Sequence, residues 1–125
     1  KIDYENFFGV SRESLIIHYQ KCDLVMFASL YEGFGLPILE AQAVGRPVIT
    51  SNLFSMPEVG GEGACYVDPY QAEDIRSAVG RIINDATYRN ELIRSGISNV
   101  EKYQLTNIAG QYAELYRAVH LEATT

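Results

Sequence analysis

Three short apolar runs divide the first half of the chain and limit the folds open to it. They cover residues 24–27, 47–50 and 64–67, and polar residues hardly interrupt them. Continuous apolar runs of this length are typical of parallel strands that are buried on both faces. Stretches with helical spacing separate the runs. Strands that alternate with helices predict a parallel α/β sheet with right-handed crossovers.

The residues that flank these runs predict where the neighbouring helices begin and end. Ser11 is the expected N-cap of a helix over residues 12–21, which would turn Leu15 and Tyr19 inward. A second helix is expected to have Pro37 in its first turn and to end at Gly45.

The remaining segments predict one more strand, a loop and three more helices. We expect a short strand at residues 5–10 and a flexible loop at residues 60–63. From residue 71 the spacing is helical. We expect one helix to start there, a second to cover residues 87–95 and be broken by Gly96, and a last one to cover residues 106–120.

Composition and charge narrow the class of protein. The 125 residues are 47% hydrophobic and carry 10 basic and 16 acidic side chains, for a net charge of −6. A soluble globular domain is therefore expected, and a nucleic-acid partner is not, because phosphate backbones select clustered Lys and Arg. Cys22 and Cys65 are isolated from each other and from any metal-binding spacing. Free buried thiols and a cytoplasmic location are the expectation.

The stretch from Glu32 to Glu40 carries the clearest chemical signal. A glycine-bearing turn before a helix places free N–H groups and the positive end of the helix dipole at the carboxyl edge of the sheet, where phosphate or pyrophosphate binds. Gly33 and Gly35 would let a ligand approach the backbone closely. Glu32 is expected in the turn and Glu40 in the first helical turn, so that both carboxylates can face one cleft and bind diols. Two plainer alternatives stay open: Glu32 could be solvated, and Glu40 could only complement the helix dipole.

Residues 29–41 resemble the Glu-x7-Glu signature of the retaining glycosyltransferases with the GT-B fold; here they read SLYEGFGLPILEA. The similarity continues through residues 45–49, 51–52, 57–60 and 68–69. The GT-B fold has two Rossmann-like lobes. The resemblance implies that residues 1–125 are part of the C-terminal, nucleotide-sugar-binding lobe. It would be an α/β domain, a Rossmann-like parallel sheet with flanking helices.

The resemblance also implies a role for each matching residue. Glu32 would contact hydroxyls of the donor hexose, and Glu40 would hold the ribose diol. The donor would be a nucleotide-diphosphate sugar, with neither a cofactor nor a metal ion. The backbone of the turn would bind the sugar hydroxyls and the diphosphate, and two further side chains would lie against the base; the turn residues are Gly33, Phe34, Gly35 and Leu36, and the base contacts are Val10 and Leu15.

Some features of the family pattern differ or lie outside this sequence. Ala28 stands where the family often has Pro, and Gln42 where Met is usual. In the family an upstream Arg and Lys neutralise the diphosphate and an N-terminal lobe binds the acceptor, and these 125 residues match neither. We therefore expect this chain alone to transfer no sugar and to need the other lobe as a partner. The alternative is a non-catalytic nucleotide-sugar-binding or partner-binding lobe.

The expected surface has two regions that invite self-association. One is an unpaired sheet edge near residues 5–10, and the other is the apolar stripe of the last helix, which includes Tyr112, Leu115 and Tyr116. The resemblance also allows the complete enzyme to work at a membrane surface.

Overall fold

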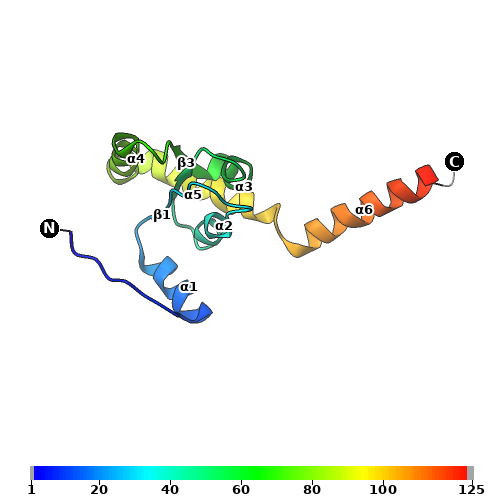
Figure 1. The fold of residues 1–125 in the computed structure, drawn as a ribbon, viewed down its shortest axis with the longest axis horizontal. Coiled ribbons are helices and arrows are strands. Elements are labelled where there is room, and N and C mark those ends of the chain that lie inside the picture. The colour runs from blue at the N-terminus through cyan, green and yellow to red at the C-terminus, as the bar shows by residue number, and fades with distance from the viewer. Residues whose placement is uncertain (1, 124–125) are drawn as a thin grey trace.

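A computed structural model describes residues 2–123, and it places a parallel sheet at the centre of the chain. The strands are β1 (Val25–Phe27), β2 (Val48–Ser51) and β3 (Ala64–Val67), in the order β1-β2-β3. Val25 pairs with Val48, and Val48 with Ala64. The predicted α/β class and the three strands are confirmed (Figure 1).

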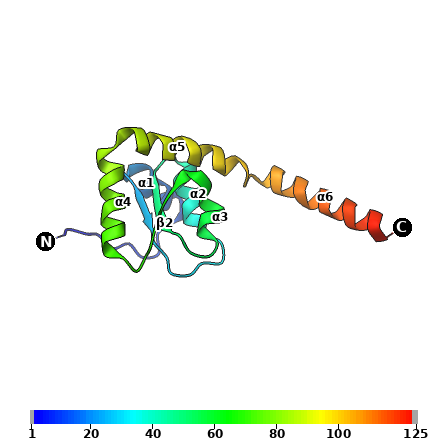
Figure 2. The ribbon, with the colours of Figure 1, turned by 90° about the horizontal axis from the view of Figure 1, so that it is seen from above.

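Helices connect the strands and then complete the chain. Figure 1 shows α1 and α2 on one side of the sheet and α4 on the other, and Figure 2 shows α4 and α5 bordering two sides of the body. The elements are α1 (Arg12–Lys21), α2 (Leu36–Ala43), α3 (Met56–Gly60), the 3-10 turn η1 (Gly61–Gly63), α4 (Ala72–Asn84), α5 (Ala86–Glu101) and α6 (Leu105–Ala123).

Each face of the sheet packs against its own apolar cluster. Neighbouring residues of a strand point to opposite faces, so Val48 joins a cluster with Ile38 of α2, while Ile49 joins one with Ile82 of α4. All four residues of β2 are buried because β2 is the central strand. β1 was expected to be buried on both faces. It lies at an edge instead, and Met26 is 47% exposed.

A buried amide network joins α2 to α5. Gln42 is 1% exposed and Asn99 is 4% exposed. The Gln42 Nε2 atom donates to the Gly60 carbonyl oxygen at 2.8 Å, and the Asn99 Nδ2 atom donates to Gln42 Oε1 at 2.9 Å and to the Val59 carbonyl oxygen at 2.8 Å. The network therefore satisfies buried polar groups of α2, α3 and α5 together.

Gly96 does not break a helix, contrary to the prediction, and α5 runs through it. A Cβ atom built on Gly63 would lie 2.3 Å from Gly96 Cα, and one built on Gly96 would lie 2.9 Å from Gln42 Cγ. Both glycines are therefore needed for the close approach of η1 to α5. The same approach explains why residues 61–63 form a 3-10 turn and not the expected flexible loop.

The predicted strand at residues 5–10 is also wrong. These residues are exposed and form no strand, because a strand needs a hydrogen-bonding neighbour and no described strand lies beside them. Phe7 instead packs on His18 of α1, with ring centroids 4.3 Å apart. The open edges of the described sheet are those of β1 and β3.

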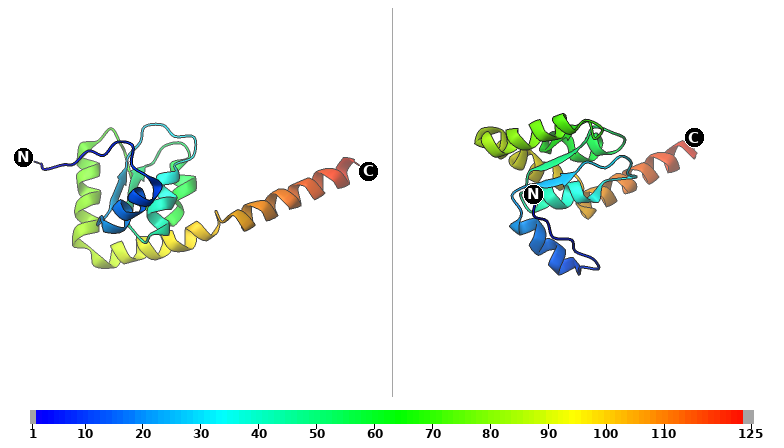
Figure 3. Two further views of the ribbon diagram at one scale, coloured as in Figure 1. Left: turned by 90° about the horizontal axis from the view of Figure 1, so that it is seen from below. Right: turned by 60° about the vertical axis from the view of Figure 1, so that its left-hand side comes forward.

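Helix α6 projects from the body, as Figures 1 and 3 show. Its apolar stripe is exposed as expected, including Tyr112, Leu115 and Tyr116. None of the helices formed by residues 2–123 is both long enough and apolar enough to cross a membrane.

Candidate functional site

The loop of residues 28–35 leaves the carboxyl end of β1 and leads into α2. Two serines near the end of β2 hold it in place. Ser51 Oγ donates to the Ser29 carbonyl oxygen at 2.6 Å, and Ser55 Oγ donates to the Glu32 carbonyl oxygen at 3.1 Å. The loop thus has a defined shape at the edge of the sheet where parallel α/β folds bind ligands.

Glu32 lies in this loop, as expected, and is half-buried. Its Oε1 atom accepts a hydrogen bond from Ser29 Oγ at 3.0 Å. This bond uses one of the roughly four acceptor positions of a carboxylate, so most of its hydrogen-bonding capacity remains for a ligand.

Glycine occupies positions 33 and 35 of the loop for different physical reasons. Gly35 caps α2 with φ 101° and ψ 45°, a left-handed conformation that favours glycine. A Cβ on Gly33 would meet no atom within 4 Å, so neither packing nor backbone strain explains glycine there. Open space beside a backbone N–H is what close approach of a ligand requires.

Backbone donors are free where the loop meets α2. Among the described residues, the N–H groups of residues 33–36 donate no hydrogen bond, and the first backbone bond at the helix start runs from Ile38 N to the Gly35 carbonyl oxygen. Pro37 has no N–H group, so the free backbone donors at the start of α2 are those of residues 33–36. Gly33, Phe34 and Leu36 are exposed, whereas Gly35 is buried.

Glu40 lies beyond the first helical turn, which corrects the prediction. It is the fifth residue of α2, and the first turn holds no acidic residue. A role limited to complementing the helix dipole is disfavoured, because that effect falls off within the first turn.

The Glu40 side chain lines a cavity of about 230 Å³ between α1 and α2. Tyr19 Oη donates to Glu40 Oε2 at 2.8 Å across it. The cavity combines one carboxylate with mostly apolar walls. It is lined by Arg12, Leu15, Ile16, Tyr19, Glu40, Ala43 and Val44.

The structure brings together only some of the predicted site residues. Leu15 and Glu40 share this cavity, whereas Val10 is 40% exposed and does not line it. Glu32 lies in the preceding loop, and the expectation that both carboxylates face one cleft stays a prediction.

Tyr19 was not predicted as a site residue. Burial, and then the hydrogen bond to the Glu40 carboxylate, raise the pKa of its hydroxyl. The phenol therefore stays protonated and remains a donor near neutral pH. Its spacing could have indicated this position, because Leu15 and Tyr19 are four residues apart and share a helix face.

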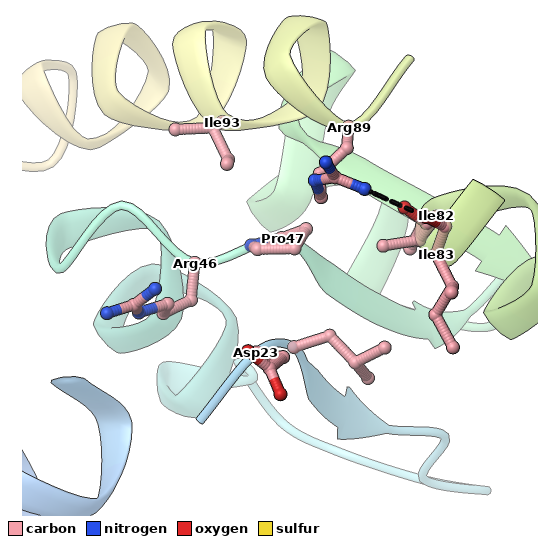
Figure 4. Close-up of a pocket in the computed structure, with 8 residues that line it drawn as sticks. Asp23, Arg46, Pro47, Ile82, Ile83, Arg89 and Ile93 are labelled. Atoms are coloured by element: carbon pink, nitrogen blue, oxygen red, sulfur yellow. Dashed lines mark hydrogen bonds between the residues drawn. The ribbon is translucent and has the colours of Figure 1, made fainter. Parts of the chain in front are cut away.

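A larger cavity, of about 690 Å³, lies at the opposite edge of the sheet (Figure 4). Residues that precede β1 and β2, among them Leu24 and Pro47, line it together with Ile82 and Ile93. Arg89 Nη1 donates to the Ile82 carbonyl oxygen at 2.7 Å. Ligands of parallel α/β sheets bind outside the carboxyl ends of the strands, so this cavity at the opposite ends of β1 and β2 is not the candidate site.

Comparison with known proteins identifies the family. Residues 4–99 match the sequence model described as "Glycosyl transferases group 1". The chain belongs to this family. A similar protein is the serotype-specific mannosyltransferase WbdA of Escherichia coli, 36% identical over 97 residues, which are 78% of this chain and 12% of that protein.

Solved structures of glycosyltransferases have the same fold. A sucrose-phosphate synthase from Thermosynechococcus elongatus superposes with a TM-score of 0.75 and 30% identity over 93% of this chain and 29% of its own. The C-terminal domain of a group 1 glycosyl transferase family protein from Francisella tularensis has a TM-score of 0.69 and 31% identity over 81% of this chain and 53% of its own. The chain has the GT-B type of α/β fold and spans only part of these relatives.

Proposed function

We propose that this chain is the donor-binding part of a cytoplasmic, retaining hexosyltransferase that uses a nucleotide-diphosphate sugar. Two observations carry the proposal: the cavity beside α2 that Glu40 and Leu15 line, and the N–H groups of residues 33–36 at the start of the same helix, which donate no hydrogen bond. One side of this arrangement suits a ribose and a base, and the other suits a diphosphate.

Each part of the donor has a matching feature in the proposal. Glu40 accepts hydrogen bonds from the ribose diol, and the base lies against Leu15 and the exposed Val10. The diphosphate lies at the N-terminus of α2, where N–H groups and the helix dipole favour negative charge. Glu32 binds hydroxyls of the hexose beyond the diphosphate.

In the proposed reaction, the bond between the anomeric carbon and the diphosphate oxygen breaks. The nucleoside diphosphate leaves with the bonding electron pair, and the acceptor hydroxyl oxygen forms its bond to the anomeric carbon on the same face and passes its proton to the departing diphosphate. The chain's own contribution is to stabilise the charge that develops on the leaving diphosphate. The acceptor, a glycan or a lipid, would bind to the partner lobe. The mannosyltransferase relatives are consistent with a hexose as the transferred sugar.

Calorimetric titration with nucleoside diphosphates tests the proposal. GDP, UDP and ADP are titrated into the wild-type chain and into the Glu40→Gln and Glu32→Gln variants. Glu40→Gln keeps the shape of the side chain but removes its charge, so the affinity for the preferred nucleotide should fall by about tenfold or more. Glu32→Gln is the matched control, because its proposed partner is the hexose, and nucleoside diphosphate affinity should barely change.

Two results would contradict the proposal. The first is that the wild-type chain binds none of the three nucleotides. The second is that Glu40→Gln binds them as tightly as wild type, which would leave Glu40 without a ligand to hold.

A further inference from the structure

The hydrogen bond between Tyr19 and Glu40 is a major link between α1 and the rest of the molecule. No residue of α1 is buried. Tyr19 packs partly against the cluster around Ile38, and Arg46 Nη2 donates to the Gln20 carbonyl oxygen at the end of the helix. The Tyr19 hydroxyl adds a bond of 2.8 Å to a carboxylate on α2. The wall of the cavity that carries Leu15 is thus held against the wall that carries Glu40.

This bond leaves Glu40 able to bind a diol. An ionised carboxylate offers about four acceptor positions on its two oxygens, and Tyr19 occupies one of them on Oε2. A vicinal diol needs two, one on each oxygen. The bond therefore fixes the rotation of the carboxylate without consuming what a ribose would use.

From this geometry we propose that Tyr19 is a positioning residue for ribose recognition, because it holds the Glu40 carboxylate in the orientation that receives the 2′ and 3′ hydroxyls of a nucleotide. The inference rests on the proposed function, since it takes Glu40 to be the ribose ligand. The Tyr19 hydroxyl donates its hydrogen bond to the Glu40 carboxylate, so removing the hydroxyl should affect the recognition of the ribose hydroxyls and not that of the phosphates.

A purely structural role for Tyr19 makes a different prediction. In that case the ring alone matters, since it packs against the apolar cluster of α2, and phenylalanine would replace it without loss. If the hydroxyl instead stabilises only the fold, its removal would weaken the binding of every ligand equally, whether or not the ligand carries a diol.

The experiment compares each nucleotide with its analogue that lacks both ribose hydroxyls. GDP, UDP and ADP and their 2′,3′-dideoxy forms are titrated by calorimetry into wild type, Tyr19→Phe, Glu40→Gln and the double variant. Wild type should prefer the ribose form by about tenfold or more, as expected for hydrogen bonds to a charged group. Tyr19→Phe should reduce this preference several-fold and leave the affinity for the dideoxy form unchanged. The double variant should match Glu40→Gln alone, because Tyr19 acts through Glu40.

Tyr66→Phe is the matched control. It also removes a phenolic hydroxyl from a half-buried tyrosine, one that donates to the Gly61 carbonyl oxygen at 2.6 Å and does not line the cavity. Its preference for the ribose form should equal that of wild type. A measurement without variants complements the control: the Cζ resonance of Tyr19 in ¹³C-tyrosine-labelled wild type should shift more with GDP than with dideoxy-GDP.

The outcomes separate the inference from the proposed function. A wild-type preference for ribose that Glu40→Gln abolishes and Tyr19→Phe leaves intact would overturn the inference and keep the proposed function. An equal loss of affinity for both nucleotide forms in Tyr19→Phe would also overturn the inference. A wild-type chain that binds no nucleotide, or shows no preference for ribose, would refute the proposed function and with it the inference.

Discussion

Replacing Gln42 by methionine tests the buried amide network that joins α2 to α5. Methionine is the residue that the resemblance to the family leads us to expect at this position, and it has nearly the same length. The change removes two hydrogen bonds, from Gln42 Nε2 to the Gly60 carbonyl oxygen and from Asn99 Nδ2 to Gln42 Oε1. One carbonyl oxygen and one amide hydrogen of the protein then remain buried without a partner.

The expected loss of stability follows from this count. Each of the two buried polar groups left without a partner costs about 1–3 kcal/mol, and the more apolar methionine side chain offsets roughly 1 kcal/mol, so we expect a net loss of about 1–5 kcal/mol. For a chain of this size the loss corresponds to a decrease of roughly 4–20 °C in Tm. Urea unfolding followed by circular dichroism measures the free energy, and calorimetry measures Tm.

Two comparisons make this test specific. Gln104→Met is the same chemical change at an exposed residue and should alter the free energy of unfolding by less than about 0.5 kcal/mol. Asn99→Leu should also destabilise the fold, and the double variant with Gln42→Met should lose less than the sum of the two single losses. A Gln42→Met variant no less stable than the Gln104→Met variant would refute the argument that the network stabilises the fold.

Three further predictions concern the glycines, a buried phenol and the exposed helix. Gly63→Ala should destabilise the fold by about 3 kcal/mol or more in urea unfolding, since its Cβ meets the backbone of Gly96, whereas Gly33→Ala should keep full stability and lose nucleotide affinity. Burial raises the pKa of Tyr66 to about 12 from an ordinary value near 10, so stability present below pH 10 should be lost as pH rises through 12, and less so in Tyr66→Phe; pH titration of Tm checks this. The exposed stripe of α6 should drive self-association that Leu115→Glu reduces, and a wild-type chain that sediments as a clean monomer at millimolar concentration would contradict it.

The strands were predictable because their signal is local. A continuous apolar run such as residues 47–50 indicates a strand that is buried on both faces, and β2 has that environment. Met26 shows that an apolar run alone does not determine how deeply a strand is buried. The run that contains it is as apolar as the others, and the order of the strands, which puts β1 at an edge, cannot be read from the run itself.

Gly96 shows that a glycine alone does not predict where a helix ends. A glycine within a helical pattern is often a stop signal, but here it allows another backbone to approach, and only the position of Gly63 in space reveals that. Gln42 is similar: it differs from the family pattern, and its partner Asn99 lies on a helix that follows much later in the chain.

The candidate site was predicted from the motif only in part. Glycine, proline and helix signals placed the turn before α2, and the resemblance to a family singled out Leu15 and Glu40, which line one cavity. Helical spacing put Tyr19 on the inner face of α1, but spacing cannot say which atom lies opposite. The contact between the Tyr19 hydroxyl and Glu40 depends on how two helices are docked, and this is a tertiary property.

The weak burial of α1 has a consequence for how sequences of this kind can diverge. The helix contributes Leu15, Ile16 and Tyr19 to the cavity, and none of its residues is buried. Substitutions on the α1 wall should therefore cost little stability, whereas substitutions of buried α2 residues such as Ile38 should cost several kcal/mol. Under the proposed function, selection for a different nucleobase can act on the α1 wall while Glu40 and the N-terminus of α2 stay unchanged. A library of variants at Leu15 and Ile16 should accordingly yield folded proteins with altered base preference far more often than a library at Ile38.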